Sequence, residues 1–216
     1  MKTKIYLIRH TQVVGNIEHR FTGRIDSDVT QKGKEYIDEL TERLKGVKFD
    51  KAYSSSTPRT RKTIQKLADM NHLTIEESQN LCEMDFGDYD GKRWEEIDEI
   101  NPEVRRIRDM KNELTHIPHQ ETMEHVASRM YKEITDISKK DDGKTILICS
   151  HGVAIEAFLR KITGDPFAVK REEYGQRNTT INVLEYDDTK NSFDILILND
   201  YSHIMNEKQK DDDSAR

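Results

Sequence analysis

The chain has 216 residues and a mass of 25.3 kDa, a size typical of one compact domain. Its formal net charge of −6 argues against a general nucleic-acid-binding protein, which ordinarily presents a basic face. No apolar run approaches the roughly 20 residues of a membrane-spanning helix, and the first residues lack the long apolar region of a secretory signal. Cys82 and Cys149 form no disulfide framework, which fits a reducing compartment. We therefore expect a cytoplasmic protein that contacts neither membrane nor nucleic acid.

Two short apolar runs, residues 4–8 and 145–149, have the composition of strands buried on both faces. A histidine follows each run within two residues: His10 after the first and His151 after the second. Further strands are predicted at residues 49–54, 73–75, 179–186 and 193–198.

Apolar residues at helical spacing predict the main helices. The first begins after Thr30, and the second begins at Thr57-Pro58, where a hydroxyl cap precedes a proline in the first turn. A third covers residues 123–137, and a fourth follows the second histidine and ends at Gly164.

The alternation of strands and helices predicts an α/β three-layer sandwich, with a mostly parallel central sheet and helices on both faces. We expect one domain over residues 1–206 and a flexible polar tail over residues 207–216. Within the domain, a polar stretch at about 84–120, interrupted by glycine and proline, is predicted to form a small helical cap. The oligomeric state is left open, with a homodimer among the alternatives.

Charged side chains stand at the carboxyl ends of the predicted strands. Arg9-His10 and Ser150-His151 follow the two apolar runs, and Arg59 begins the helix after another strand. Ligands of open α/β sheets bind at this edge, so we expect these side chains to share one crevice. Arginine offers a planar pair of donors that matches phosphate oxygens, and a histidine beside it can attack phosphorus. The cluster therefore suits a tetrahedral dianion.

Five segments in order along the chain carry a resemblance to the histidine phosphatase superfamily, which includes cofactor-dependent phosphoglycerate mutases and two-histidine phosphatases. Residues 9–16 look like the Arg-His-Gly-Glu-Thr-x-x-Asn signature of that superfamily. The other segments are residues 20–33, 53–63, 81–91 and 148–152. Together they span most of the chain, and they place it with the two-histidine phosphatases.

The resemblance implies a role for each residue of the cluster. His10 would be the nucleophile that becomes a phosphohistidine, and Arg9, Arg59 and His151 would hold the transferring phosphoryl oxygens. Glu83 would protonate the leaving oxygen and then activate water.

The same resemblance assigns the substrate contacts. Asn16 and the amide of Gly152 would contact phosphate, and Thr22 and Gly23 would form a turn against the substrate. The substrate would be a small phosphorylated metabolite. No metal and no other cofactor is expected, because the arginines supply the positive charge.

The chain departs from the family pattern at several positions. Thr11 stands in place of the signature glycine, where its side chain could narrow the pocket or alter a backbone contact. Gln12-Val13 replaces Glu-Thr, and Lys62 replaces a common glutamine. These changes bear on the substrate and remove no residue that the chemistry needs. Nearby histidines, at positions 116, 119 and 125, lack metal-ligand spacing and are expected to line the mouth of the pocket instead.

Three functions stay open at this stage. A metal-independent phosphatase is favoured, because only 38 positions separate Glu83 from Glu121, whereas mutases of the family carry a longer insertion there. A phosphoglycerate mutase is the nearest alternative, and a phospho-ligand-binding regulatory domain with little turnover is the third. Phosphosugars, phosphoglycerates, nucleotide monophosphates and α-ribazole phosphate all fit the family as substrates.

Overall fold

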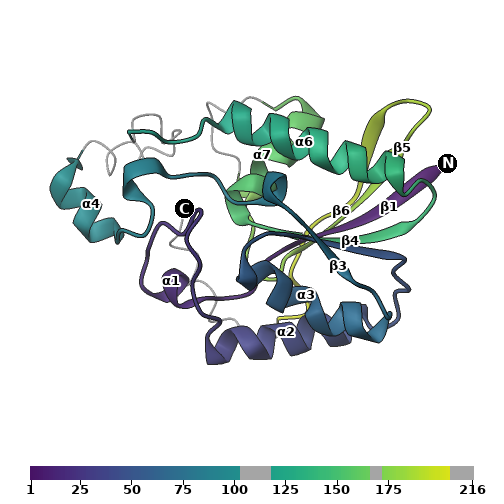
Figure 1. Cartoon of the computed structure of the whole chain (residues 1–216), viewed down its shortest axis with the longest axis horizontal. Helices are drawn as coiled ribbons and strands as arrows, with labels where there is room; N and C mark the ends of the chain where they lie inside the picture. Colours follow the sequence, from purple (N-terminus) through teal and green to yellow (C-terminus); the bar gives the residue numbers. More distant parts are fainter. Residues whose placement is uncertain (103–117, 166–171, 205–216) are drawn as a thin grey trace.

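The computed structural model describes residues 1–102, 118–165 and 172–204. Within them, six strands form one sheet in the order β3-β2-β4-β1-β5-β6 (Figure 1). The strands are β1 Lys2–Arg9, β2 Lys51–Ser55, β3 Ile75–Ser78, β4 Thr145–Ser150, β5 Ile181–Asp187 and β6 Ser192–Asp200. Neighbours among β1 to β4 are parallel, whereas β5 runs antiparallel to both β1 and β6. The predicted mostly parallel sheet is therefore confirmed.

Helices cover both faces of this sheet, which confirms the three-layer prediction (Figure 1). The helices α2 (Gln31–Leu44) and α3 (Pro58–Met70) lie on one face, and α6 (Met123–Lys140) and α7 (Gly152–Thr163) lie on the other. Successive side chains of a strand point to opposite faces, and β4 is apolar on both. Its Ile146 and Ile148 join the larger core under α6 and α7, whereas Leu147 and Cys149 join the core under α2 and α3.

The helix ends follow the sequence signals with one exception. Thr30 caps α2, because its Oγ1 accepts a hydrogen bond from the Gly33 amide at 2.8 Å. The α7 helix ends at Gly164, whose φ of +75° is the left-handed conformation that glycine adopts easily. The predicted hydroxyl cap at Thr57 is wrong, since its Oγ1 instead lies 2.8 Å from Ser55 Oγ. Pro58 does occupy the first turn of α3, as expected.

Two strands are displaced from their predicted positions. The strand expected at 73–75 is β3, Ile75–Ser78, and the one expected at 49–54 begins at Lys51. Because β3 is an edge strand, it tolerates the half-buried and exposed carboxylates Glu76 and Glu77 and has little apolar signature. Periodicity alone therefore could not locate it.

The segment at 84–120 contains short helices in its described part, and it packs against the loop that follows β1. These helices are η2 (Gly87–Tyr89) and α4 (Trp94–Ile100). Outside this segment, the described residues form three more short helices: α1 (Val14–Ile17), η1 (Gln79–Leu81) and η3 (Glu172–Tyr174). Phe21 stacks on Trp94 at 5.4 Å between ring centroids and meets Phe86 edge-on at 4.8 Å. The rest of the predicted cap, residues 103–117, and the predicted tail lie outside the described residues.

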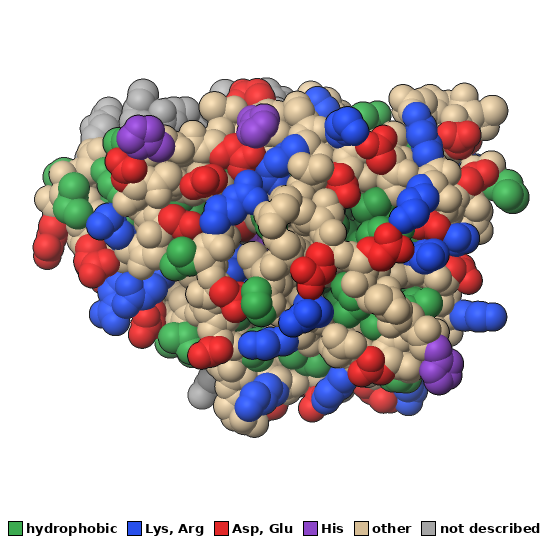
Figure 2. All heavy atoms as spheres, viewed as in Figure 1, with side chains coloured by type: hydrophobic (Ala, Val, Ile, Leu, Met, Phe, Trp, Pro, Cys, Tyr) green, Lys and Arg blue, Asp and Glu red, His purple; other side chains and the backbone are tan. Residues whose placement is uncertain are grey.

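The surface carries charges of both signs. Figure 2 shows basic and acidic side chains mixed over the face in view, which accords with the modest net charge of −6. No helix among the described residues combines the length and the apolar composition that crossing a membrane requires.

Candidate active site

The two histidines meet because their strands are neighbours in register. Arg9 pairs with Ser150 at the carboxyl ends of β1 and β4, and the His10 amide donates to the Ser150 carbonyl at 2.9 Å. The next residue on each strand is a histidine, and the centroids of the two rings are 5.1 Å apart. Both side chains are buried. The sequence-predicted convergence at this edge is therefore present in the structure.

The tautomer of His10 follows from its hydrogen bond. Its Nδ1 lies 2.7 Å from the Thr11 carbonyl oxygen, which can only accept, so Nδ1 carries the proton. Nε2 is then the nitrogen with the lone pair. Burial, followed by the charges of Arg59 and Arg9, lowers the pKa of His10 well below its ordinary value. His10 is thus a neutral imidazole with a nucleophilic Nε2.

His151 is held in the opposite tautomer. Arg59 Nη2, which can only donate, lies 3.1 Å from His151 Nδ1, and Ser55 Oγ lies 2.8 Å from Nε2. Nδ1 is therefore the acceptor, and the Nε2 proton points to the serine hydroxyl. Burial and the charge of Arg59 lower the pKa of this histidine also. The ring is neutral and fixed beside His10.

Arg59 is fully buried and joins the turn at 22–26 to the histidines. Its Nη2 donates to the carbonyls of Thr22 at 3.0 Å and Gly23 at 2.9 Å, and Nη1 donates to that of Ile25 at 2.6 Å. The carboxylate of Asp26 lies 3.5 Å from Nη1. The buried Nε has no hydrogen-bond partner among the described residues, which leaves a charged donor fit for an anionic ligand.

Arg9 lies on the other side of the pair, against the start of α7. Its Nη1 donates to the Gln176 carbonyl, and its guanidinium packs on Gly152, where a β-carbon would lie 3.4 Å from the arginine Cζ. A β-carbon there would be in ordinary van der Waals contact with Arg9, so the cation lies directly against the first turn of the helix. Arg9 is 8% exposed, so both arginine charges are nearly withdrawn from water.

Glu83 receives the first amides of α7. Its Oε1 accepts from the Met84 and Ala154 amides, each at 2.9 Å, and its Oε2 accepts from the Val153 amide at 3.1 Å. The amide of Gly152 makes no hydrogen bond to the described residues and stays available to a ligand. A helix N-terminus favours negative charge, and the three amides satisfy the oxygens of a side chain that is only 7% exposed.

Asn16 completes the cluster through Asn178, which contacts the backbone of His10. Its Oδ1 accepts from the Val13 amide at 3.0 Å and from Asn178 Nδ2 at 3.4 Å. The same Asn178 nitrogen donates to the His10 carbonyl at 3.1 Å. The structure thus brings the predicted site residues together: Arg9, His10, Asn16, Thr22, Gly23, Arg59, Glu83, His151 and Gly152.

Several residues that support the site were missed by sequence reasoning. Ser55 fixes His151, Asp26 faces Arg59, and Gln176 and Asn178 bind Arg9 and His10. One available signal was the polar run before β5, because buried amide side chains next to a strand usually satisfy backbone groups. The hydroxyl of Ser55 carried no comparable signal.

Thr11, the departure beside the nucleophile, is buried against α2 and α3. Its Oγ1 donates to the Gly33 carbonyl at 2.6 Å, and its amide donates to Thr63 Oγ1 at 2.9 Å. The side chain therefore helps to attach the loop after β1 to the helices on that face.

Two other histidines of interest contact carboxylates at the surface. His119 Nδ1 lies 2.9 Å from an Asp88 carboxylate oxygen, and His125 Nδ1 lies 2.8 Å from Glu121 Oε1. The third, at position 116, lies outside the described residues. Within the described ranges, no group of three histidine, cysteine or acidic residues is arranged to hold a metal ion.

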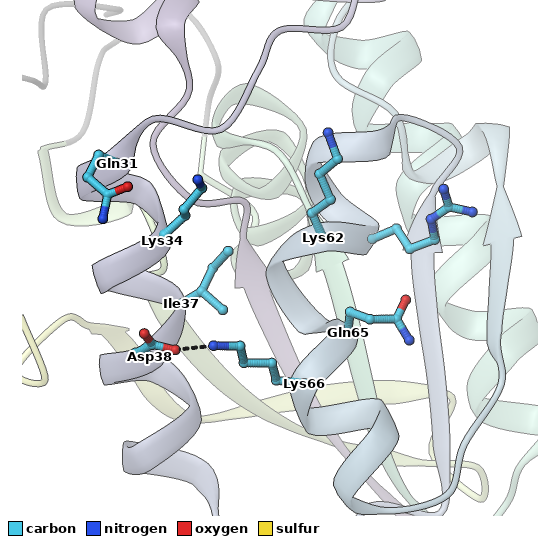
Figure 3. A pocket seen from close by; sticks show the side chains of 8 residues that line it. Gln31, Lys34, Ile37, Asp38, Lys62, Gln65 and Lys66 are labelled. Atoms are coloured by element: carbon cyan, nitrogen blue, oxygen red, sulfur yellow. Dashed lines mark hydrogen bonds and ion pairs between the residues drawn. The ribbon is translucent and has the colours of Figure 1, made fainter.

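A separate groove of about 680 Å³ lies between α2 and α3 (Figure 3). Lys34 and Lys62 reach its rim from the two helices, Ile37 lies between them, and Asp38 pairs with Lys66. Neither strand-end histidine lines this groove. It is a surface feature apart from the histidine site.

Comparison with known proteins agrees with this geometry. The family model of the histidine phosphatase superfamily (branch 1) matches residues 5–200. The protein named "Probable phosphoglycerate mutase GpmB" of Enterobacter sp. (strain 638) is 26% identical over 204 residues, which are 93% of this chain and 94% of that protein. The protein named "Putative phosphoserine phosphatase 2" of Hydrogenobacter thermophilus is 32% identical over 162 residues, which are 74% of this chain and 79% of that protein.

Among solved structures, Bacillus stearothermophilus YhfR superposes with a TM-score of 0.85 and 25% sequence identity. The match covers 93% of this chain and 98% of that chain. The arrangement of strands and helices is therefore shared over nearly the whole length.

Proposed function

The chain belongs to the histidine phosphatase superfamily, branch 1, and we propose that it is a phosphatase that hydrolyses small phosphomonoesters through a phosphohistidine at His10. One observation carries the proposal. His10 is a buried neutral imidazole with its lone pair on Nε2; its ring lies beside the His151 ring that Arg59 contacts, and the charges of Arg59 and Arg9 both act on it. Asp26 is the carboxylate that faces Arg59, and a phosphoryl dianion would supply the further negative charge that two buried cations favour.

In the first half-reaction, the substrate phosphoryl group binds between the arginines and the free Gly152 amide. His10 Nε2 attacks phosphorus, the N–P bond forms, and the P–O bond to the leaving group breaks. The arginines stabilise the charge on the phosphoryl oxygens, where most of the rate acceleration of such a transfer arises. Asn16 supports the pocket through its Nδ2, because its Oδ1 is engaged by Val13 and Asn178.

Glu83 completes both half-reactions. Its Oε2 accepts one backbone amide whereas Oε1 accepts two, so Oε2 is the oxygen better placed to carry a proton. It gives that proton to the departing alkoxide oxygen. In the second half-reaction, the carboxylate takes a proton from water, the water oxygen attacks phosphorus, and the N–P bond breaks to release inorganic phosphate and regenerate His10.

A phosphoglycerate mutase is the second candidate, because a relative with that name matches 93% of this chain. Both enzymes would form the same phosphohistidine. The mutase returns the phosphoryl group to phosphoglycerate, whereas the phosphatase passes it to water.

Phosphate release from a panel of phosphosugars, phosphoglycerates, phosphoserine and nucleotide monophosphates tests the proposal. We expect metal-independent release with at least one of them, in excess chelator and without a bisphosphorylated primer. Rapid quench should trap an acid-labile phosphoenzyme, and His10→Ala should abolish it while the circular dichroism spectrum stays unchanged. Return of most of the phosphoryl group to phosphoglycerate would establish the mutase instead, and loss of activity on chelation would overturn the metal-free mechanism.

A further inference from the structure

The backbone around Glu83 is held by a largely buried arginine side chain of α6. The guanidinium of Arg129 donates to three backbone carbonyl groups of this segment. Its Nη1 donates to Asn80 at 2.8 Å and to Cys82 at 2.7 Å, and its Nη2 donates to Glu83 at 3.0 Å. Its side chain is 9% exposed. One rigid planar group thus fixes the path of the chain up to the carboxylate.

Glu121 holds the same segment from the other side. It pairs with Arg129 in bidentate form, with Oε1 2.7 Å from Nε and Oε2 2.9 Å from Nη2. Its Oε2 also accepts from the Asp85 amide at 3.2 Å, and its own amide donates to the Asp85 carbonyl at 2.9 Å. The two side chains therefore clamp residues 80–85, with Glu83 between their attachment points.

Glu121 is ionised in this pair, and most of both side chains is shielded from water. Burial alone would raise the pKa of Glu121, but the hydrogen bonds and charge of Arg129 outweigh it and hold that pKa below its usual value. Its side chain is 6% exposed, and the surface groups Arg24 and His125 approach it at 3.6 Å and 2.8 Å. A buried bidentate pair costs more to assemble than a surface pair, so its use next to a proton donor calls for a functional reason.

We propose that the Arg129–Glu121 pair positions Glu83 as the proton donor, and this inference rests on the proposed phosphatase reaction. Neither side chain touches the reacting atoms. The pair acts by fixing the Glu83 backbone, so that the carboxyl group keeps its alignment with both the α7 amides and the leaving oxygen. Loss of the clamp would loosen that alignment while Arg9, Arg59 and His10 stay in place.

The way in which kcat/KM depends on the leaving group of the substrate tests this role. An alkyl phosphate needs a proton at its departing oxygen, whereas p-nitrophenyl phosphate needs little help. We expect Arg129→Met to lower kcat/KM for an alkyl phosphate by about 10²-fold and for p-nitrophenyl phosphate by less than about 5-fold. Arg129→Lys should recover only part of the loss, because an ammonium group cannot bridge three carbonyls and a bidentate carboxylate. Glu121→Gln, which keeps the shape of the side chain, should also lower kcat/KM more for the alkyl phosphate than for p-nitrophenyl phosphate. It replaces Arg129→Met in the test if that variant does not fold.

The matched control is Arg43→Met, which breaks an arginine–aspartate pair with Asp200 far from Glu83 and should leave both rates unchanged.

Equal losses on the two substrates, or no loss on either, would overturn the positioning role. Glu83→Gln provides the reference, because it should show the same selectivity by itself. If wild type hydrolyses neither substrate class, the proposed function fails. If Glu83→Gln is selective and the Arg129 and Glu121 variants are not, the positioning role alone fails.

Discussion

At the scale of single residues, the protonation of the site histidines decides the chemistry. We predict that neither the His10 nor the His151 imidazole titrates near pH 6.5 as an ordinary histidine does, because burial and the neighbouring arginines lower both pKa values well below that. NMR of the imidazole C–H groups, assigned with His10→Ala, measures this directly. A titration centred near pH 6.5 for either ring would contradict the neutral assignment.

Thr11 offers a second test at this scale. Thr11→Val removes the hydroxyl that donates to the Gly33 carbonyl and leaves that acceptor buried. We expect a loss of about 1–3 kcal/mol in the free energy of unfolding, measured by urea denaturation. Since the side chain is directed to the helices, kcat on an aryl phosphate should stay within about 3-fold of wild type. Thr41→Val, which removes a similar bond to the Ile37 carbonyl within α2, is the control for a lost hydroxyl. A much larger loss of kcat would mean that Thr11 shapes the pocket.

The sequence predicted which residues meet and missed how they bind one another. Strand ends marked His10 and His151, and the buried cluster follows directly from the parallel register of β1 and β4. Thr22 and Gly23 were expected to form a turn against the substrate, and the structure adds that their carbonyls accept hydrogen bonds from Arg59. Any backbone carbonyl can accept a hydrogen bond, so the residue type carries no signal for such a contact.

At the scale of elements, the first turn of α2 lies against the loop that follows the nucleophile. A β-carbon at Gly33 would lie 2.2 Å from the Gln12 carbonyl oxygen, closer than any real contact allows. We predict that Gly33→Ala displaces the helix or the loop and lowers the free energy of unfolding by about 1–3 kcal/mol, with a loss of kcat/KM. Gly46→Ala, where a β-carbon meets nothing within 4 Å, should change neither quantity. Equal behaviour of the two variants would show that the contact relaxes freely.

Elements with an apolar face were predictable, and those without one were not. The α6 helix presents Val126, Met130 and Ile134 to the core at helical spacing, and its predicted start at residue 123 is confirmed. The β3 edge strand has only four residues with no buried position, so its composition resembles that of a loop. The Arg129–Glu121 pair was also invisible in the sequence, because a charged residue on a helix is usually solvated.

At the scale of the whole molecule, stability should fall in mild acid. The pKa values of His10, His151 and His203 are lowered by burial, that of His203 to about 4, so the folded chain binds fewer protons than the unfolded chain below pH 6.5. Unfolding is then favoured as pH falls through that range, by up to about 1.4 kcal/mol per pH unit for each such histidine. Urea denaturation at pH 8, 6.5 and 5.5 measures the loss. A free energy of unfolding that is constant over this range would contradict it.

The place of β1 in the sheet has a consequence for how the protein is made. Its two neighbours, β4 and β5, begin at Thr145 and Ile181, so β1 leaves the ribosome long before the strands with which it pairs. Until then, β2 and β3 are the described strands that can pair with each other. Such long-range closure folds slowly and exposes an apolar strand in the meantime. We therefore expect a nascent chain arrested before residue 145 to be cleaved readily by protease at β1, and to need chaperones until β4 emerges.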